Sequence, residues 1–378
     1  MDSQPLLDGF DGLGAGRESH LTAQLITCIG NKRALLEPIT RIVRDVASRL
    51  APRRLVTADL FSGSGVVARL LKRYSCELYV NDLERYAEVI SRCYLANAEE
   101  LDLKALAASY DLLKRDLHEK PLRPGFIAEL YAPEVDEAVR PGERVFYTQR
   151  NARFLDTARQ AIGALPAWQH PFFLAPLLSE ASIHANTAGV FKGFYKDPAS
   201  GVGVFGGKAG NALGRIMSDI ELHFPALSPD SARVHITRAD ANSIVSDLPE
   251  LDLAYLDPPY NQHPYGSNYF MLNLLTEYKR PSELSRVSGI PVDWARSRYN
   301  RQHESLSVFS ELLGNLPAKY MLISFNSEGF ISEPQMRATL SRFGTVQVYP
   351  HRYNAFRGSR NLSKRDTHVT EYLFLVER

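Results

Sequence analysis

Short apolar runs that end in turns recur in two parts of the chain, separated by a long stretch with helical periodicity. In the first part, residues 54–58 and 77–80 have the character of buried strands, and residues 66–71 between them have that of a helix. In the second part, strand-like runs occur at residues 233–236, 253–256, 320–323 and 369–376. Residues 102–178 are mostly helical in period, with a proline-rich interruption at 121–141. This alternation predicts an α/β fold with one mostly parallel, doubly wound sheet around a largely helical insertion.

The run at residues 253–256 is followed by Asp257-Pro258-Pro259-Tyr260. An exocyclic amino nitrogen of adenine or cytosine is a poor nucleophile, because its lone pair is delocalised into the ring. The carboxylate of Asp257 and the backbone carbonyl of Pro258 can each accept one amino hydrogen and offset the positive charge that grows during methyl transfer. The two prolines fix the backbone, and Tyr260 offers a face on which an extruded base can stack. The motif indicates amino-group methylation, with an ordinary proline turn as the alternative interpretation of these residues alone.

A second site is indicated where the strand at residues 54–58 runs into Asp59-Leu60-Phe61-Ser62-Gly63-Ser64-Gly65 and then into a helix. Gly63 and Gly65 permit a tight turn and let a ligand approach the backbone. A pyrophosphate fingerprint requires a third glycine, and Ala68 is at best a partial substitute, so a nucleoside without phosphates fits better. The strand at 77–80 ends at Asp82, which we expect to bind ribose hydroxyls, cap the following helix, or both.

In this order, the motifs resemble those of the DNA adenine-N6 methyltransferases of the Dam-like and type II restriction-modification kind, which use S-adenosylmethionine. The resemblance runs from about Leu21 to the C-terminus and is that of the subgroup with the cofactor half first. It implies catalytic roles for Asp257, Pro258, Pro259 and Tyr260. It also implies a cofactor site formed by Gly30 and Lys32 beside the methionine end, by Asp59, Phe61, Gly63, Gly65 and Asp82, and by Asp240 at the cofactor's adenine. The chain departs from the pattern at Cys28, where an aromatic residue is common, and at Phe270, where histidine is frequent.

The resemblance implies a site-specific DNA adenine-N6 methyltransferase of a restriction-modification system, which transfers the methyl group in line to an adenine flipped out of duplex DNA. A cysteine nucleophile would serve carbon-5 methylation of cytosine, and none of the three cysteines lies in a proline-cysteine loop. The same chemistry on cytosine N4 or on RNA, and a DNA-binding module that has lost catalysis, stay open as alternatives. Asp257 favours adenine, because cytosine-N4 enzymes more often carry serine at that position.

The formal net charge of +1 requires that DNA contacts come from local groups of basic residues. We expect Arg298, Arg352, Arg357 and Arg360 to contact DNA, together with Lys192 in a segment that reaches toward DNA in relatives; a solvated basic face is the alternative. The glycine-rich residues 201–214 are interpreted as a loop that orders on DNA or, alternatively, as a phosphate site. Cys28, Cys76 and Cys93 show no paired spacing, so we expect core packing without disulfide, zinc or any other metal.

Four segments are expected from these motifs. They are a flexible tail at residues 1–20, a cofactor-binding half at 21–100, a helical insertion with the DNA-contacting segment at 101–232, and a catalytic half at 233–378. No apolar run approaches the roughly 20 residues of a membrane span and no secretory signal is recognisable, so a cytoplasmic protein is expected. We expect it to act as a monomer on double-stranded DNA, with a cognate restriction endonuclease acting separately.

Overall fold

The computed structural model describes residues 21, 25–26, 32–207, 210, 212–354 and 368–378. Within these ranges one sheet has seven strands in the order β3-β2-β1-β4-β5-β7-β6. The strands are β1 (Leu55–Asp59), β2 (Ser75–Asp82), β3 (Arg233–Arg238), β4 (Leu251–Leu256), β5 (Ala318–Asn326), β6 (Thr345–Asn354) and β7 (His368–Glu377). The first five are parallel, whereas β7 is antiparallel to both β5 and β6. The expected mostly parallel sheet is therefore confirmed.

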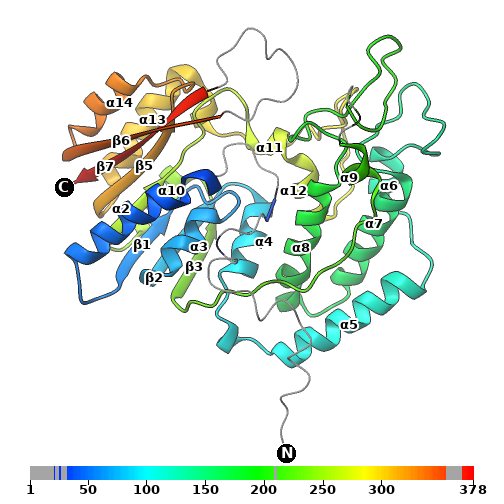
Figure 1. The fold of residues 1–378 in the computed structure, drawn as a ribbon, viewed down its shortest axis with the longest axis horizontal. Coiled ribbons are helices and arrows are strands. Elements are labelled where there is room, and N and C mark those ends of the chain that lie inside the picture. Colours follow the sequence, from blue (N-terminus) through cyan, green and yellow to red (C-terminus); the bar gives the residue numbers. More distant parts are fainter. Residues whose placement is uncertain (1–20, 22–24, 27–31, 208–209, 211, 355–367) are drawn as a thin grey trace, which may run out of the picture.

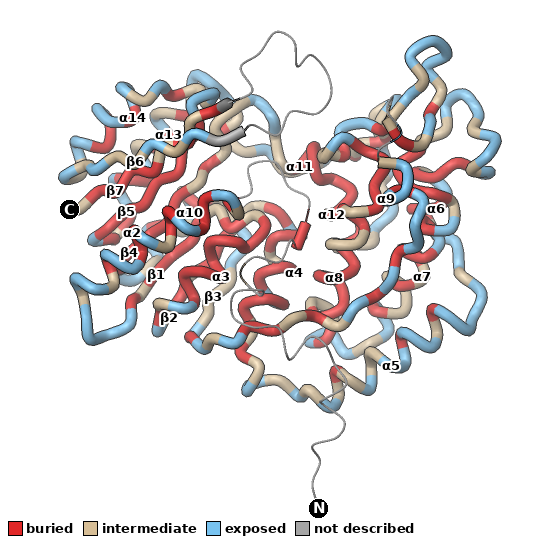
Figure 2. The backbone as a smooth tube through the Cα atoms, in the orientation of Figure 1, coloured by how far each residue is buried: buried red, intermediate tan, exposed pale blue. Residues whose placement is uncertain are grey.

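Helices cover both faces of this sheet, which gives the doubly wound arrangement (Figure 1). All six residues of β4 are buried, as expected for a strand that is covered on both sides. Leu253 and Tyr255 pack with α2 (Leu36–Arg49) and α3 (Val66–Lys72). Ala254 and Leu256 pack with α13 (Gln302–Asn315) and α14 (Glu333–Leu340). Figure 2 shows the buried backbone that runs through these strands. The fold is Rossmann-like.

The helical region lies beside the sheet and packs against α4 (Arg85–Tyr94) and α12 (Phe270–Glu277) (Figure 1). It contains α5 (Leu103–Glu119), α6 (Phe126–Tyr131), α7 (Gln149–Gly163) and α8 (His170–Ile183). Two of these helices begin with side-chain caps: Asp102 accepts a hydrogen bond from the backbone N–H of Ala105, and Thr148 accepts one from that of Asn151. α6 lies inside the proline-rich stretch that interrupts the helical pattern.

The remaining short helices are α9 (Leu213–Met217), α10 (Ala241–Ile244) and α11 (Tyr265–Asn268), with 3₁₀ turns at Arg33–Leu35, Ala98–Glu100, Ala167–Gln169, Val245–Asp247 and Arg298–Asn300. None of the helices in the described ranges is both long and apolar enough to cross a bilayer.

Three expectations need correction or fall outside the described ranges. Cys93 is buried as expected, but Cys76 is exposed near the start of β2, where its thiol contacts the backbone carbonyl of Leu55. Arg352 belongs to strand β6, which the sequence pattern did not predict. Cys28, Gly30, Arg357 and Arg360 lie outside the residues that the structure describes.

Candidate active site

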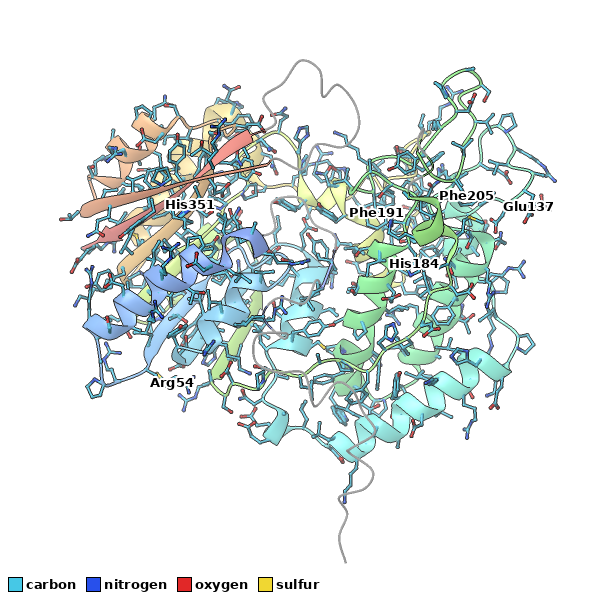
Figure 3. The ribbon with its side chains drawn as sticks, viewed as in Figure 1. Arg54, Glu137, His184, Phe191, Phe205 and His351 are labelled. Carbon is cyan, nitrogen blue, oxygen red and sulfur yellow. The ribbon has the colours of Figure 1, made fainter. Side chains whose placement is uncertain are left out.

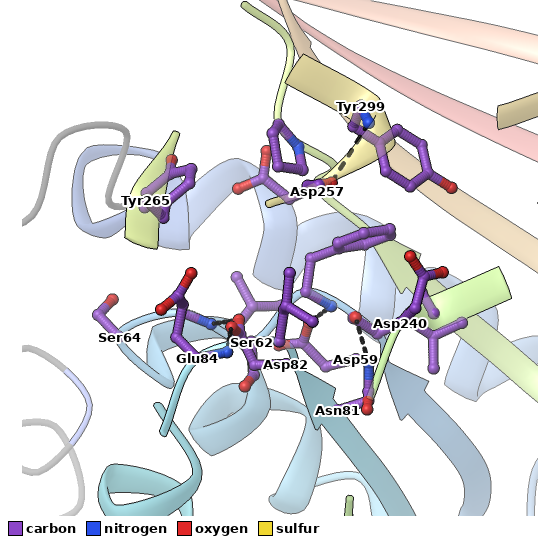
Figure 4. Close-up of a pocket in the computed structure, with 18 of the residues that line it drawn as sticks. Asp59, Ser62, Ser64, Asn81, Asp82, Glu84, Asp240, Asp257, Tyr265 and Tyr299 are labelled. Atoms are coloured by element: carbon purple, nitrogen blue, oxygen red, sulfur yellow. Dashed lines mark hydrogen bonds between the residues drawn. The ribbon is translucent and has the colours of Figure 1, made fainter. Parts of the chain in front are cut away.

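A cavity lies at the carboxyl edge of the sheet, where β1, β2 and β4 end. The strand order reverses between β1 and β4, and ligands of open α/β sheets bind at such switch points. Figure 4 shows the side chains around this cavity. Among the residues that line it are the sequence-predicted Lys32, Asp59, Phe61, Gly63, Asp82, Asp240, Asp257 and Pro259. The fold therefore gathers around one space residues that are more than 220 positions apart in the sequence, since Lys32 and Asp257 both line it.

The turn between β1 and α3 forms the floor of the cavity. Gly63 and Gly65 have φ angles of 50° and 72°, which is the left-handed region that glycine adopts without strain. The backbone N–H of Gly65 donates to the carbonyl of Ser62 at 2.7 Å, and that of Gly63 donates to Asp82 Oδ2 at 2.7 Å. Both glycines are thus required by the backbone, as expected, although Gly65 itself does not line the cavity.

Asp82 connects the glycine turn to the next strand. Its second oxygen accepts a hydrogen bond from the backbone N–H of Glu84 at 2.9 Å. Asp82 is not the cap of α4, because that helix begins at Arg85 with Glu84 as its N-cap residue. Its carboxylate therefore fixes the shape of the cavity, and its remaining lone pairs are available to a ligand.

Glu84 is a cavity residue that the sequence analysis missed. It is 4% exposed and accepts a hydrogen bond from Asn273 Nδ2 at 2.6 Å. Burial raises the pKa of Glu84 to about 7, with the hydrogen bond from Asn273 acting in the opposite direction. Its position two residues beyond Asp82, where strand β2 ends, is the signal that could have identified it.

Among the residues that the structure describes, five carboxyl groups line the cavity: those of Asp59, Asp82, Glu84, Asp240 and Asp257. Among the described lining residues, Lys32 is the only cationic side chain. Burial raises the pKa of Asp59 well above its usual range and also raises that of Asp82. An excess of buried carboxylates is costly unless a cation compensates it, so the cavity favours a positively charged ligand.

Lys32 links two of the acidic groups near the end of β4. Its ammonium nitrogen lies 3.0 Å from Asp257 Oδ1 and 3.0 Å from Glu371 Oε1. Burial raises the pKa of Asp257 to about 7, and the nearby Lys32 acts against this rise. Glu371, which lies on β7, is a second residue that the sequence analysis missed.

The Asp-Pro-Pro-Tyr motif separates this cavity from a neighbouring one. Pro259 and Tyr265 line both cavities. The second cavity is also lined by Tyr260, His263, Asn268, Tyr269 and the exposed Lys192. The ring of Tyr260 meets that of Phe325 edge-on, with 6.0 Å between the ring centroids. The second cavity is therefore rich in aromatic side chains and shares the wall at Pro259 with the first.

Lys192 is held at this place by its neighbour. The buried Phe191 packs against Phe146 and Phe270, and its backbone N–H donates to the carbonyl of Asn268 at 2.7 Å. Figure 3 shows Phe191 where the helical region meets α11 and α12. The segment that was expected to reach toward DNA is thus anchored next to the Asp-Pro-Pro-Tyr loop.

The other predicted DNA contacts differ in their surroundings. The guanidinium of Arg298 forms ion pairs with Glu304 at 3.4 Å and Glu311 at 3.5 Å, which reduces the positive charge that it presents. Arg352 is exposed near the end of β6. β6 runs in the same direction as β5, because both are antiparallel to β7, so this end lies at the carboxyl edge of the sheet.

Comparison with known protein families decides the identity of the chain. The family described as D12 class N6 adenine-specific DNA methyltransferase matches residues 29–288, which include the glycine turn and the Asp-Pro-Pro-Tyr motif. The chain belongs to this family. Accordingly, it is an adenine-specific DNA methyltransferase, and its substrate is DNA.

Several curated proteins can be aligned with this DNA methyltransferase over most of its length. The type II methyltransferase M.NlaIII of Neisseria lactamica is 29% identical over 362 residues, which cover 93% of this chain and 98% of the relative. The type II methyltransferase M.CviAII of Paramecium bursaria Chlorella virus 1 is 29% identical over 345 residues, which cover 89% of this chain and 94% of the relative. The modification methylase StsI of Streptococcus sanguinis is 26% identical over 365 residues, which cover 93% of this chain but 51% of that protein.

Solved structures give a much weaker likeness. A Thermoplasma acidophilum protein covers 96% of this chain and 98% of its own with a TM-score of 0.36 and 8% identity. The magnesium protoporphyrin IX methyltransferase of Synechocystis PCC 6803, solved with bound SAM, aligns with 96% of this chain and 90% of its own chain. The TM-score is 0.31 and the sequence identity is 8%. The fold of this enzyme is defined by its own sheet order.

Proposed function

We propose that this enzyme transfers a methyl group from S-adenosylmethionine to N6 of an adenine that is flipped out of duplex DNA. The observation that carries the proposal is the adjacency of two cavities that share Pro259 and Tyr265 as walls. One cavity is rich in carboxylates and suits a cationic methyl donor, whereas the other is rich in aromatic side chains and suits a base. Asp257 lines the donor cavity and precedes the shared wall residue Pro259 by two positions.

The donor cavity fits S-adenosylmethionine by charge and by hydrogen-bonding groups. This cofactor supplies an electrophilic methyl group on a positively charged sulfonium. We propose that Asp82 binds the ribose hydroxyls, that Asp240 binds the amino group of the cofactor's adenine, and that Phe61 contacts its ring. Asp59, which is 1% exposed, is placed to compensate a positive charge. By resemblance, Gly30 and Lys32 would lie beside the methionine end of the cofactor.

The Asp-Pro-Pro-Tyr loop is proposed to bind the amino group and the ring of the adenine. Asp257 accepts one hydrogen of the adenine amino group, and the carbonyl of Pro258 accepts the other, which localises the nitrogen lone pair and offsets the charge that develops on it. Pro258 and Pro259 hold the loop rigid, so that the geometry exists before the base arrives. Tyr260 stacks on the base. The amino group is not deprotonated beforehand, because N6 becomes acidic only after it carries the methyl group.

Duplex DNA is proposed to approach the carboxyl edge of the sheet, where both cavities lie. Lys192 stands beside the base cavity and is the best supported phosphate contact. Arg352 lies at the same edge, and Arg357 and Arg360 follow it in the sequence. The ion pairs of Arg298 make it the weakest of these candidates. The helical region is proposed to contribute to sequence recognition.

The biological setting is inferred from two relatives that match about nine tenths of this chain, both of which are type II methyltransferases. We propose that the enzyme works as a monomer in a restriction-modification system, with a cognate endonuclease that acts separately on the same sequence.

Replacing Asp257 by alanine tests the catalytic assignment. Asp257→Ala should reduce methylation of unmethylated duplex DNA by at least about a hundredfold, because the main acceptor for the amino group is removed. Binding of S-adenosylmethionine, measured by calorimetry, should persist. Asp45→Ala is the matched control, since this exposed aspartate on α2 forms an ion pair with Arg49 and lies outside both cavities. Retention of most activity in Asp257→Ala would overturn the assignment.

A further inference from the structure

Lys32 lies between two carboxylates that come from different strands of the sheet. Its ammonium nitrogen is 3.0 Å from each of Asp257 and Glu371. The side chain of Lys32 is 5% exposed and that of Glu371 is 1% exposed, whereas Asp257 is 17% exposed on the side of the cavity. The three side chains form a chain of contacts. Glu371 contacts Lys32, and Lys32 contacts Asp257, which faces the cavity.

Glu371 is fixed by β5 as well as by Lys32. Its Oε1 accepts a hydrogen bond from Ser324 Oγ at 2.6 Å, and its Oε2 accepts one from Asn326 Nδ2 at 3.1 Å. Asn326 stands directly opposite Glu371 in the antiparallel pairing of β5 with β7. Such contacts stabilise the ionised form of a buried carboxyl group. Consistently, Lys32 and these hydrogen bonds lower the pKa of Glu371, although burial acts in the opposite direction.

The charge of this cluster bears on the chemistry. Asp257 and Lys32 alone would form a neutral buried pair, which would weaken the ability of Asp257 to offset the positive charge that develops on the amino nitrogen. When Asp257 is ionised, the cluster with Glu371 has two carboxylates and one ammonium, and hence one net negative charge. Burial lowers the pKa of Lys32, but the two carboxylates outweigh this effect and raise it, so the ammonium stays protonated.

We propose that Glu371 is a positioning residue for methyl transfer, which anchors Lys32 against Asp257 and keeps the cluster negatively charged so that Asp257 can compensate the charge on the attacked amino group. This role rests on the function proposed above. Glu371 does not line the cavity, so it acts through Lys32 rather than on the base.

Other charged or titratable groups also face this cluster. Asp59 at the end of β1 interacts electrostatically with Asp257, and Tyr255 and Tyr260 interact with Lys32. None of the three is changed by a substitution at Glu371, so a shift in the pH profile of such a variant reports on Glu371 and its contacts.

The test is the pH dependence of kcat/KM for the cofactor in Glu371→Gln, which keeps the shape of the side chain and removes its charge. Glu371 raises the pKa of Asp257, so its neutralisation should move the acid limb of the profile to lower pH by roughly one unit. The plateau should fall about tenfold, because the cluster loses its net negative charge. Glu371→Asp, which retains the charge, should leave the limb in place. Glu377→Gln on the same strand is the matched control, because this half-buried glutamate pairs with Arg49 and Tyr320 and lines neither cavity.

An acid limb that does not move in Glu371→Gln would overturn the proposal, because a purely structural role lowers stability without shifting the limb. If Glu371→Gln does not fold, the comparison is made between Lys32→Met and the double variant Lys32→Met/Glu371→Gln, which buries fewer unpaired charges. The acid limb of the double variant should lie at a lower pH than that of Lys32→Met. Acid limbs at the same pH in the two variants would refute the proposal. Absence of methyl transfer by the unaltered enzyme would instead refute the proposed function.

Discussion

At the scale of single residues, the donor cavity is controlled by carboxyl groups that burial makes hard to ionise. The pKa values of Glu84 and Asp257 are both raised to about 7, so both groups are partly protonated near neutral pH when no ligand is bound. A bound cation stabilises their ionised forms and lowers these pKa values. Protons must then leave on binding, and by linkage the affinity for the cation must increase with pH.

Affinity for S-adenosylmethionine should therefore increase between pH 6 and 8, and binding should release protons in this range. Calorimetry in two buffers with different ionisation enthalpies measures that release. S-adenosylhomocysteine, which lacks the sulfonium charge, provides the control and should release fewer protons. Equal proton release for both ligands would show that the carboxylates do not sense the sulfonium.

The residues that could be predicted from the sequence are those whose roles depend on near neighbours in the chain. Asp257 follows a buried strand directly, and Gly63 and Gly65 lie in a strand-turn-helix unit. Glu371 could not be found in this way, because it reaches Lys32 only through the pairing of β7 with β5. Lys32 and Glu371 are 339 positions apart in the sequence, so no local pattern connects them.

At the scale of elements, the glycine turn between β1 and α3 is the feature that most directly shapes the cavity. Gly65→Ala should destabilise the fold by about 1–2 kcal/mol, because alanine is strained at a φ of 72°. The added Cβ would meet only Ile90 Cγ2 at 3.5 Å, so the cost is conformational rather than steric. Urea unfolding measures this change, and cofactor affinity should fall with it.

Gly314→Ala is the matched control for the turn. Gly314 lies inside helix α13, and an added Cβ there meets Phe343 Cε1 at an ordinary 3.8 Å. This substitution should stabilise the protein by up to about 1 kcal/mol, because alanine favours helix more than glycine does. Equal effects of the two substitutions would contradict the argument that the positive φ matters.

The strands of the parallel core were predictable because burial on both faces leaves a continuous apolar run, as in β4. Strand β6 was missed for the opposite reason. It is an edge strand, polar at many positions and interrupted by Pro350, and such strands lack the pattern that marks a buried one. Arg352 was consequently assigned to a basic stretch of the chain, whereas it lies on a strand that carries it to the carboxyl edge.

At the scale of the whole molecule, the net charge of +1 means that DNA affinity must come from a few well-placed cations. Lys192→Ala should weaken binding to duplex DNA similarly for all sequences and reduce the salt dependence of the binding constant by about one unit of slope. Fluorescence anisotropy at several salt concentrations measures both effects. Lys120→Ala is the control, because that ammonium is paired with Asp116 at the end of α5. An unchanged slope in Lys192→Ala would remove this residue from the interface.

The arrangement of the whole chain could be predicted in outline but not in its DNA contacts. The order of the motifs predicted the mostly parallel sheet and the helical insertion, because strands and helices alternate regularly on either side of the inserted residues. Which basic side chains are free to meet phosphate depends on the folded surface, as Arg298 illustrates: its sequence neighbourhood is basic, yet it pairs with Glu304 and Glu311.

The most direct test of the central claim is to identify the methylated product. The protein is incubated with S-adenosylmethionine and unmethylated duplex DNA of mixed sequence, and the DNA is then digested to nucleosides for mass spectrometry. We predict N6-methyladenine as the methylated nucleoside. N4-methylcytosine would contradict the assigned base, and the absence of any methylated nucleoside despite demonstrated binding of the cofactor would contradict the assigned reaction.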